Sequence, residues 1–120
     1  MKKKTVVIGA STSPERYAYK AVVALQHHQH EVVPVGIKKG EINGLEILQG
    51  KPEIKDVDTV SLYVGPLHQA EWMDYVISLH PKRVVFNPGT ENPVFEELLK
   101  KNNIEAEEAC TLVMLSIGNY

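Results

Sequence analysis

The sequence predicts an α/β domain with a Rossmann-like, doubly wound and mostly parallel sheet, covered by helices on both faces. Short apolar runs rich in β-branched residues alternate along the chain with segments whose apolar residues repeat at helical spacing. The connections are short, and strands joined through helices pair in parallel. The 120 residues suffice for one such domain and are too few for two. We therefore expect a single domain over residues 1–120.

The first half of the chain is expected to begin with a strand at "TVVIG" (5–9) and a helix over 14–30. One face of this helix carries four apolar residues at i, i+3, i+4 and i+7, namely Ala18, Ala21, Val22 and Leu25. A second strand is expected over 31–36, and its Pro34 favours the edge of the sheet because proline cannot donate to a ladder. We expect the following residues, up to 58, to be mostly connection, with a short strand at 45–48.

The second half continues the alternation of strand and helix. Strands are expected at 59–64 and 83–87, with a helix from Pro66 to about Leu79 between them. Asn92 and Pro93 form an N-cap signal for a helix that ends near Lys101. "IEAEEA" predicts a last short strand and "CTLVMLSI" a closing helix, whose run from Leu112 to Leu115 is expected to lie in the core. Ligands of such folds bind beyond the carboxyl ends of the strands, where the strand order reverses.

The composition excludes several classes of function. The chain is 43% hydrophobic and 23% charged with a formal net charge of −2, which is typical of a globular protein that binds neither nucleic acid nor membrane. Its apolar runs are far shorter than the roughly 18 residues of a membrane helix, and the basic start turns polar too soon for a signal peptide. The single cysteine, Cys110, cannot form an internal disulfide. We expect a cytoplasmic protein.

The turn after the first strand, "GASTSPE", has features of a phosphate-binding loop. Ser13 is a favoured N-cap and Pro14 a favoured first helical residue, so a helix N-terminus with unpaired N–H donors is expected here. Gly9 permits close approach of the backbone, and the hydroxyls of Ser11, Thr12 and Ser13 add donors. A plain capped helix after a strand would look the same, and Glu15 opposes a phosphate if it faces the loop. The turn alone is compatible with both interpretations.

The nucleotide class is narrowed by two further observations. The dinucleotide fingerprint would need glycine at positions 9, 11 and 14, and only Gly9 is present. The second strand runs into Lys38 and Lys39 rather than into an acid that could bind a ribose hydroxyl. Lysines at this place favour a ligand with an extra phosphate. Coenzyme A (CoA), with its 3′-phosphate, meets both conditions, and NADP meets them less well.

The chain resembles the small stand-alone CoA-binding proteins, whose domain is similar to the N-terminal domain of the succinyl-CoA synthetase alpha subunit. The likeness rests on "VVIGAS", "EVVPVGIK", "VDTVSLYVGP" and a near-terminal cysteine, Cys110. Gly36 and Ile37 stand where that family has Asn-Pro. The resemblance implies that Lys38 lies by the ribose phosphate. It also implies phosphate contacts from Gly9, Ala10, Ser11 and Ser13, and an adenine site along Val64, Gly65 and Pro66.

Other candidate residues have simpler explanations. His27 and His30 have the spacing of a metal pair, but histidines at a helix end are expected to lie in solvent. Cys110 opens a helix and could be a reactive thiol, although a buried, inert cysteine is the favoured interpretation. Gly89 could approach a ligand or simply form a turn. Tyr17 and Tyr19 are expected to pack on the sheet, although one could cover a ligand.

We expect no catalytic residues and no metal. The predicted function is the binding of CoA or an acyl-CoA by a non-catalytic module, and the sequence names no protein partner. The synthetase that the domain resembles uses parts of another domain for its chemistry. The alternatives are an NADP-dependent reductase or nucleotide-sensing regulator, and a protein-interaction module whose pocket is vestigial.

Overall fold

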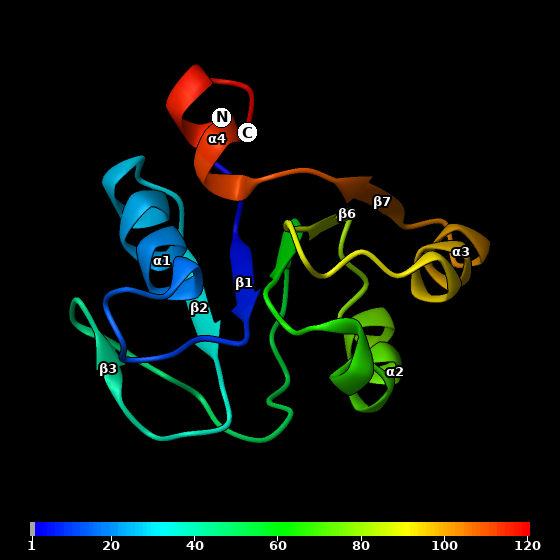
Figure 1. Ribbon diagram of the computed structural model, residues 1–120, viewed down its shortest axis with the longest axis horizontal. Helices are drawn as coiled ribbons and strands as arrows, with labels where there is room; N and C mark the ends of the chain where they lie inside the picture. The colour runs from blue at the N-terminus through cyan, green and yellow to red at the C-terminus, as the bar shows by residue number, and fades with distance from the viewer. Residues whose placement is uncertain (1) are drawn as a thin grey trace.

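The computed structural model describes residues 2–120 and has a five-stranded, all-parallel sheet at its centre (Figure 1). The strand order is β2-β1-β5-β6-β7, and each neighbouring pair is parallel. This confirms the predicted α/β Rossmann-like class and the edge position of Pro34. The strands are β1 (Thr5–Ile8), β2 (Val32–Val35), β5 (Thr59–Leu62), β6 (Arg83–Phe86) and β7 (Glu105–Glu108).

Four α-helices cover the two faces of the sheet among the described residues. On one face lie α1 (Tyr17–His27) and α4 (Thr111–Ile117), and on the other α2 (Ala70–Ser78) and α3 (Pro93–Lys101). Successive residues of β1 point to opposite faces, so Val7 packs with the α1 side while Val6 and Ile8 pack with the α2 side. The four residues predicted to share one face of α1 are all buried.

The start of α1 differs from the prediction. The helix begins at Tyr17 rather than at Pro14, with Arg16 as a cap residue that makes no side-chain cap bond. Residues 13–16 form a turn closed by a 3.0 Å hydrogen bond from the Arg16 N–H to the Ser13 carbonyl. Pro14 occupies the second position of this turn, which proline favours as much as the first turn of a helix. Ser13 is therefore not the N-cap.

A second difference is a hairpin in the segment expected to be mostly connection. β3 (Glu41–Ile42) and β4 (Leu45–Glu46) pair in antiparallel fashion across Asn43 and Gly44, whose φ angles are 47° and 89°. Positive φ at both central residues is typical of a type I′ turn, which Asn-Gly favours. The Asn-Gly dipeptide was therefore a usable signal in the sequence. The strand expected at 45–48 ends at Glu46, although Leu48 still makes a parallel bridge with Val35.

The remaining elements follow the predictions closely. The helix expected from Pro66 is a short 3₁₀ helix, η1 (Pro66–His68), followed by α2, and the Asn92 side chain caps α3 at the Phe95 N–H. The closing helix is amphipathic rather than wholly buried. Met114 and Leu115 lie in the core, whereas Val113 is 52% exposed, because a helix on a sheet buries only one stripe. None of the described helices has the length and apolar character needed to cross a membrane.

Candidate functional site at the switch point of the sheet

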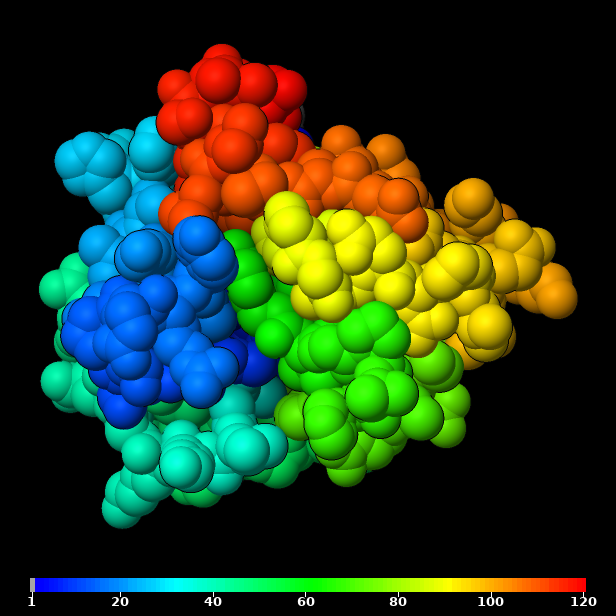
Figure 2. Space-filling view, in the orientation of Figure 1, coloured from blue at the N-terminus to red at the C-terminus, as the bar shows by residue number. Residues whose placement is uncertain are grey.

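The order of the strands reverses between β1 and β5. From β1 the chain passes to β2 on one side, and the next strand of the sheet, β5, pairs with β1 on the other side. At such a point the loops diverge and leave a crevice beyond the carboxyl ends of the strands. Figure 2 shows a hollow between the blue segment that follows β1 and the green segment that follows β5. The predicted site residues flank this reversal.

Gly9 is required by packing within the protein. It has a φ of 97°, and a Cβ atom there would lie 2.9 Å from the carbonyl oxygen of Tyr63. The N–H groups of Gly9 and Ala10 both donate to the Val35 carbonyl at 3.0 Å. From the sequence, the expected reason for a glycine at this position was the close approach of the backbone to a ligand. The structure provides a second reason, which is the contact between the loops after β1 and β5.

The loop after β1 keeps some of its donors free. The Ser13 N–H donates to the Ser11 side-chain oxygen at 3.2 Å, so this N–H is already engaged. Among the described residues, the N–H groups of Ser11 and Thr12 have no hydrogen-bond partner. The hydroxyls of Ser11 and Ser13 remain able to donate outward. An anion would be bound here by loop amides and hydroxyls, one turn before α1 begins.

The segment after β2 is packed against this loop at both of its ends. A Cβ atom at Gly36 would collide with the Ala10 carbonyl, and one at Gly40 would collide with the Thr12 side chain. Lys38 and Lys39 lie between these two glycines, are exposed, and form no ion pair with a described residue. The two glycines therefore hold the backbone that carries this pair of free cations against the loop after β1. Ile37, which precedes them, is 79% exposed.

The third predicted segment follows β5. Val64 and Gly65 are half-buried, and Pro66 is exposed at the start of η1. Nothing lies within 4 Å of the position that a Cβ atom would take at Gly65, so the space beside it is open. Gln69, which no sequence signal marked, is fully buried behind this segment and donates a 2.8 Å hydrogen bond to the Val64 carbonyl.

Tyr63 is a second residue that the sequence did not mark. Its hydroxyl is buried and has no hydrogen-bond partner among the described residues. Burial raises the pKa of Tyr63, and the neighbouring Cys110 acts in the same direction. The phenol is therefore neutral at physiological pH. Cys110 itself is half-buried at the N-cap of α4, so the prediction of a buried cysteine was wrong.

The other candidates lie elsewhere or have structural roles. His27 is exposed, and His30 accepts a 2.9 Å hydrogen bond from the Lys3 N–H through Nδ1. No group of three metal-ligating side chains occurs in the described part of the chain. Tyr17 is 68% exposed rather than packed on the sheet, whereas Tyr19 packs with the α1 side of the core. The Gly89 N–H donates to Glu91 at 2.9 Å within its own turn.

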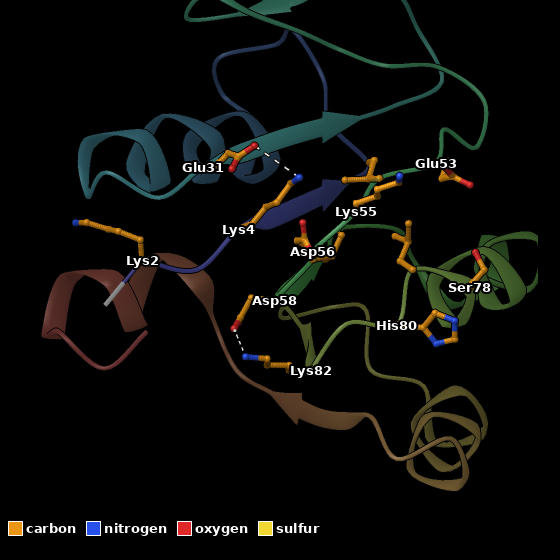
Figure 3. Close-up of a pocket in the computed structure, with 13 residues that line it drawn as sticks. Lys2, Lys4, Glu31, Glu53, Lys55, Asp56, Asp58, Ser78, His80 and Lys82 are labelled. Carbon is orange, nitrogen blue, oxygen red and sulfur yellow. Dashed lines mark ion pairs between the residues drawn. The ribbon is translucent and has the colours of Figure 1, made fainter.

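A second hollow, of about 1010 Å³, lies at the opposite edge of the sheet (Figure 3). Its walls carry charges of both signs, which pair in two places: Lys4 with Glu31 at 3.7 Å and Lys82 with Asp58 at 3.9 Å. None of the predicted site residues lines it. This edge holds the amino ends of the strands, where ligands of doubly wound sheets are not bound.

The fold and the loops at its switch point define a Rossmann-like α/β domain. The chain belongs to the CoA binding domain family, whose model matches residues 3–116. Membership supports binding of a CoA-type ligand in general. It confirms the resemblance that the sequence motifs indicated.

Several solved structures share this fold. A crystal structure of an uncharacterized protein has 51% sequence identity and a TM-score of 0.98, and the match covers 100% of this chain and 99% of that chain. A protein from Thermus thermophilus has 23% identity and a TM-score of 0.87, over 99% of this chain and 91% of that one. A dinucleotide-forming acetyl-coenzyme A synthetase from Ca. Korarchaeum cryptofilum has 19% identity and a TM-score of 0.67. The match covers 87% of this chain and 25% of that one. The last two show the fold alone. No curated protein matches the chain.

Proposed function

We propose that the protein binds CoA or an acyl-CoA in the hollow at the switch point, as a binding module without catalysis. The observation that carries this proposal is the interlocking of the loops after β1 and β2. It holds the free amides of Ser11 and Thr12 beside Lys38 and Lys39. In a ligand with a pyrophosphate and a separate ribose phosphate, the pyrophosphate can accept from the free amides and the ribose phosphate can pair with a lysine.

The proposed contacts follow the three segments. The pyrophosphate lies on the loop that holds Gly9, Ala10, Ser11 and Ser13, and the 3′-phosphate lies by Lys38. The adenine lies along Val64, Gly65 and Pro66, where the open space beside Gly65 admits a flat ring. The proposal includes a cytoplasmic location, supported by the single cysteine of the chain.

The lysines also support a second candidate. NADP carries a ribose phosphate that Lys38 or Lys39 could pair with, so an NADP-dependent reductase or nucleotide sensor shares part of this evidence. The missing glycines at positions 11 and 14 favour CoA, because a dinucleotide loop needs them for close contact with its pyrophosphate.

Titration calorimetry of the purified chain with CoA, dephospho-CoA, NADP and NAD tests the proposal. We expect CoA to bind more tightly than dephospho-CoA, and both to bind more tightly than NAD. A mass spectrum of the gently purified protein should show a mass increase equal to CoA or an acyl-CoA. Tighter binding of NADP than of CoA would replace the proposal by the second candidate. Absence of binding to all four ligands would favour the protein-interaction module.

A further inference from the structure

Gln69 joins two loops at the carboxyl edge of the sheet. It is fully buried between η1 and α2, and its side-chain nitrogen donates to the carbonyls of Val64 at 2.8 Å and Thr90 at 2.7 Å. Its side-chain oxygen accepts a 2.9 Å hydrogen bond from Asn92 Nδ2. One side chain therefore connects the segment after β5 with the segment after β6.

The residue type is unusual for its local position. Gln69 is the N-cap residue of α2, where Ser, Thr, Asp and Asn are favoured because their short side chains reach the first N–H groups. Its side chain makes no cap bond, since it is directed across to the neighbouring loop. Gln69 thus departs from the N-cap preference and makes a contact with a distant loop instead. Departures of this kind from local sequence preference are expected at functional sites.

The far end of the link is also fixed. Asn92 caps α3 by accepting from the Phe95 N–H at 3.3 Å, which leaves its Nδ2 to donate to Gln69. Thr90 is held by two hydrogen bonds to the Asn87 carbonyl, from its N–H at 2.9 Å and its hydroxyl at 2.7 Å. Thr90 and Asn92 therefore fix the Gln69 amide that donates to the Val64 carbonyl.

We propose that Gln69 is a positioning residue of the switch-point site. It fixes the path of Val64–Pro66 and couples ligand binding there to the segment from Thr90 to Asn92. This inference rests on the proposed function, because it needs CoA to contact the segment after β5. The inference adds Gln69 to the site as a residue that does not touch the ligand. It also adds the segment from Thr90 to Asn92 as a second loop that responds to ligand binding.

The substitution Gln69→Met tests the positioning role. Methionine has nearly the same length but no amide, so the carbonyls of Val64 and Thr90 lose their donor and Asn92 Nδ2 loses its acceptor, while the buried volume is nearly kept. We expect the affinity for CoA, measured by calorimetry, to fall about tenfold, the effect of one or two lost hydrogen bonds. Gln26→Met is the matched control, because the Gln26 amide bonds with Asn43 on the hairpin β3–β4. The control should bind CoA as the wild type does.

The changes in amide chemical shift on CoA binding separate the two roles, because a purely structural role of Gln69 would not alter which amides respond to the ligand. In the wild type, CoA should shift the amide signals of Ser11, Gly65 and Thr90. In Gln69→Met at saturating CoA, Gly65 should still shift, whereas Thr90 should not. A Thr90 shift of equal size in the variant would overturn the coupling, and so would an unchanged affinity.

The outcomes separate this inference from the proposed function. If CoA shifts Ser11 and Gly65 of the wild type but not Thr90, the proposed function stands and the coupling is wrong. If CoA shifts none of the three, both are wrong. Should Gln69→Met fail to fold, Asn92→Ser keeps an oxygen cap for α3 and removes only the donor to Gln69. CoA should then shift the Phe95 amide in the wild type and not in this variant, and equal shifts would overturn the coupling.

Discussion

Gly9 and Gly65 both follow central strands, but the structure constrains only the first. Gly9 has positive φ and touches the Tyr63 backbone, so Gly9→Val would strain the fold as well as the site. Gly65 has a φ of −64° and a ψ of 156°, which any residue adopts before a proline, and its surroundings are open. Gly65 is therefore the glycine at which ligand binding and folding can be separated.

Gly65→Val should leave the melting temperature within about 2 °C of the wild type, because the added side chain enters open space and substitutions of this kind usually change stability by less than about 0.5 kcal/mol. The valine side chain would occupy the space proposed for the adenine, so CoA affinity should fall at least about tenfold. Calorimetry and a thermal melt of the same sample measure both effects. Unchanged CoA affinity in a folded Gly65→Val protein would refute the adenine site.

Lys38 and Lys39 determine the proposed preference for CoA over dephospho-CoA. A charge-assisted bond contributes about 1.5–3 kcal/mol, and exposure of both lysines places the expected effect at the lower end, about tenfold in affinity. The double substitution Lys38→Ala, Lys39→Ala should weaken CoA by that factor and leave dephospho-CoA unchanged. Calorimetry at two salt concentrations should show the wild-type preference shrinking as salt screens the pair.

The adjacent pair Lys100 and Lys101, at the end of α3, is the matched control. Replacing both by alanine removes the same charge from another part of the surface. That variant should keep the wild-type preference for CoA. If the Lys38, Lys39 variant keeps it as well, neither lysine binds the ribose phosphate.

His30 makes a pH-dependent contribution to stability. Partial burial lowers its pKa, Lys2 adds to the effect, and its Nδ1 must be unprotonated to accept from the Lys3 N–H. The unfolded chain therefore binds a proton at His30 more readily than the native protein does. The stabilisation is complete above the ordinary pKa of about 6.5 and is lost as pH falls through the lower native value. His30→Asn should reduce the fall in melting temperature between pH 7 and pH 5. An identical fall in both proteins would contradict this assignment.

At the scale of elements, α4 depends on polar contacts at both ends. At its start, the Thr111 N–H donates to Asn87 Oδ1 at 2.8 Å. Beyond its end, the Tyr120 hydroxyl lies 2.6 Å from the Thr5 hydroxyl, and the Tyr120 ring lies 4.6 Å from the Arg83 guanidinium. A helix of 7 residues is too short to be stable alone, so these contacts and its buried face hold it.

Tyr120→Phe should lower the free energy of unfolding by about 1 kcal/mol. The Thr5 hydroxyl already donates to the Lys3 carbonyl at 3.0 Å, so the Tyr120 hydroxyl is the donor of the bond that is lost. Tyr120→Ala should cost more, because it also removes the ring that covers buried Arg83. Urea unfolding measures both, and Tyr17→Phe, at an exposed tyrosine, is the control. Equal stability of Tyr120→Phe and wild type would show that the hydroxyl bond contributes nothing.

At the scale of the whole molecule, ligand binding and folding are linked. A ligand that binds only the native state stabilises it by about 2.7 kcal/mol at one hundred times its dissociation constant. CoA should therefore raise the melting temperature of the chain by several degrees, while NAD at the same concentration should not. Thermal-shift curves over a concentration series measure this. Equal shifts with CoA and NAD would contradict the proposed ligand.

The architecture was predictable because its signals are local and repeated. Each strand of the sheet was predicted as a short run of residues between turns or helical segments. The buried face of α1 follows from the helical spacing of its apolar residues. The start of α1 was missed because Ser13 and Pro14 suit a turn as well as a helix start. The hairpin β3–β4 was missed although its Asn-Gly turn is a strong signal.

The candidate site was predictable only in part. Sequence motifs indicated which loops to examine, because ligands of this fold bind beyond the carboxyl ends of the strands. The contact of Gly36 with Ala10 depends on how two loops pack in space. The link from Gln69 to Thr90 joins residues 21 positions apart through a side chain with no distinctive neighbours in sequence. Such features follow from the tertiary fold rather than from local pattern.

The contact between the two ends of the described chain has a consequence for how the domain can be connected to others. Lys3 Nζ donates to the Tyr120 carbonyl at 2.6 Å, and both residues lie at the edge of the sheet that is opposite the switch point (Figure 1). A short linker there could join the ends into a circularly permuted chain, opened for example at the exposed turn between Asn43 and Gly44. A neighbouring domain attached at the same place would leave the loops at the switch point uncovered. The match to only 25% of the Korarchaeum chain shows this fold within a much longer protein.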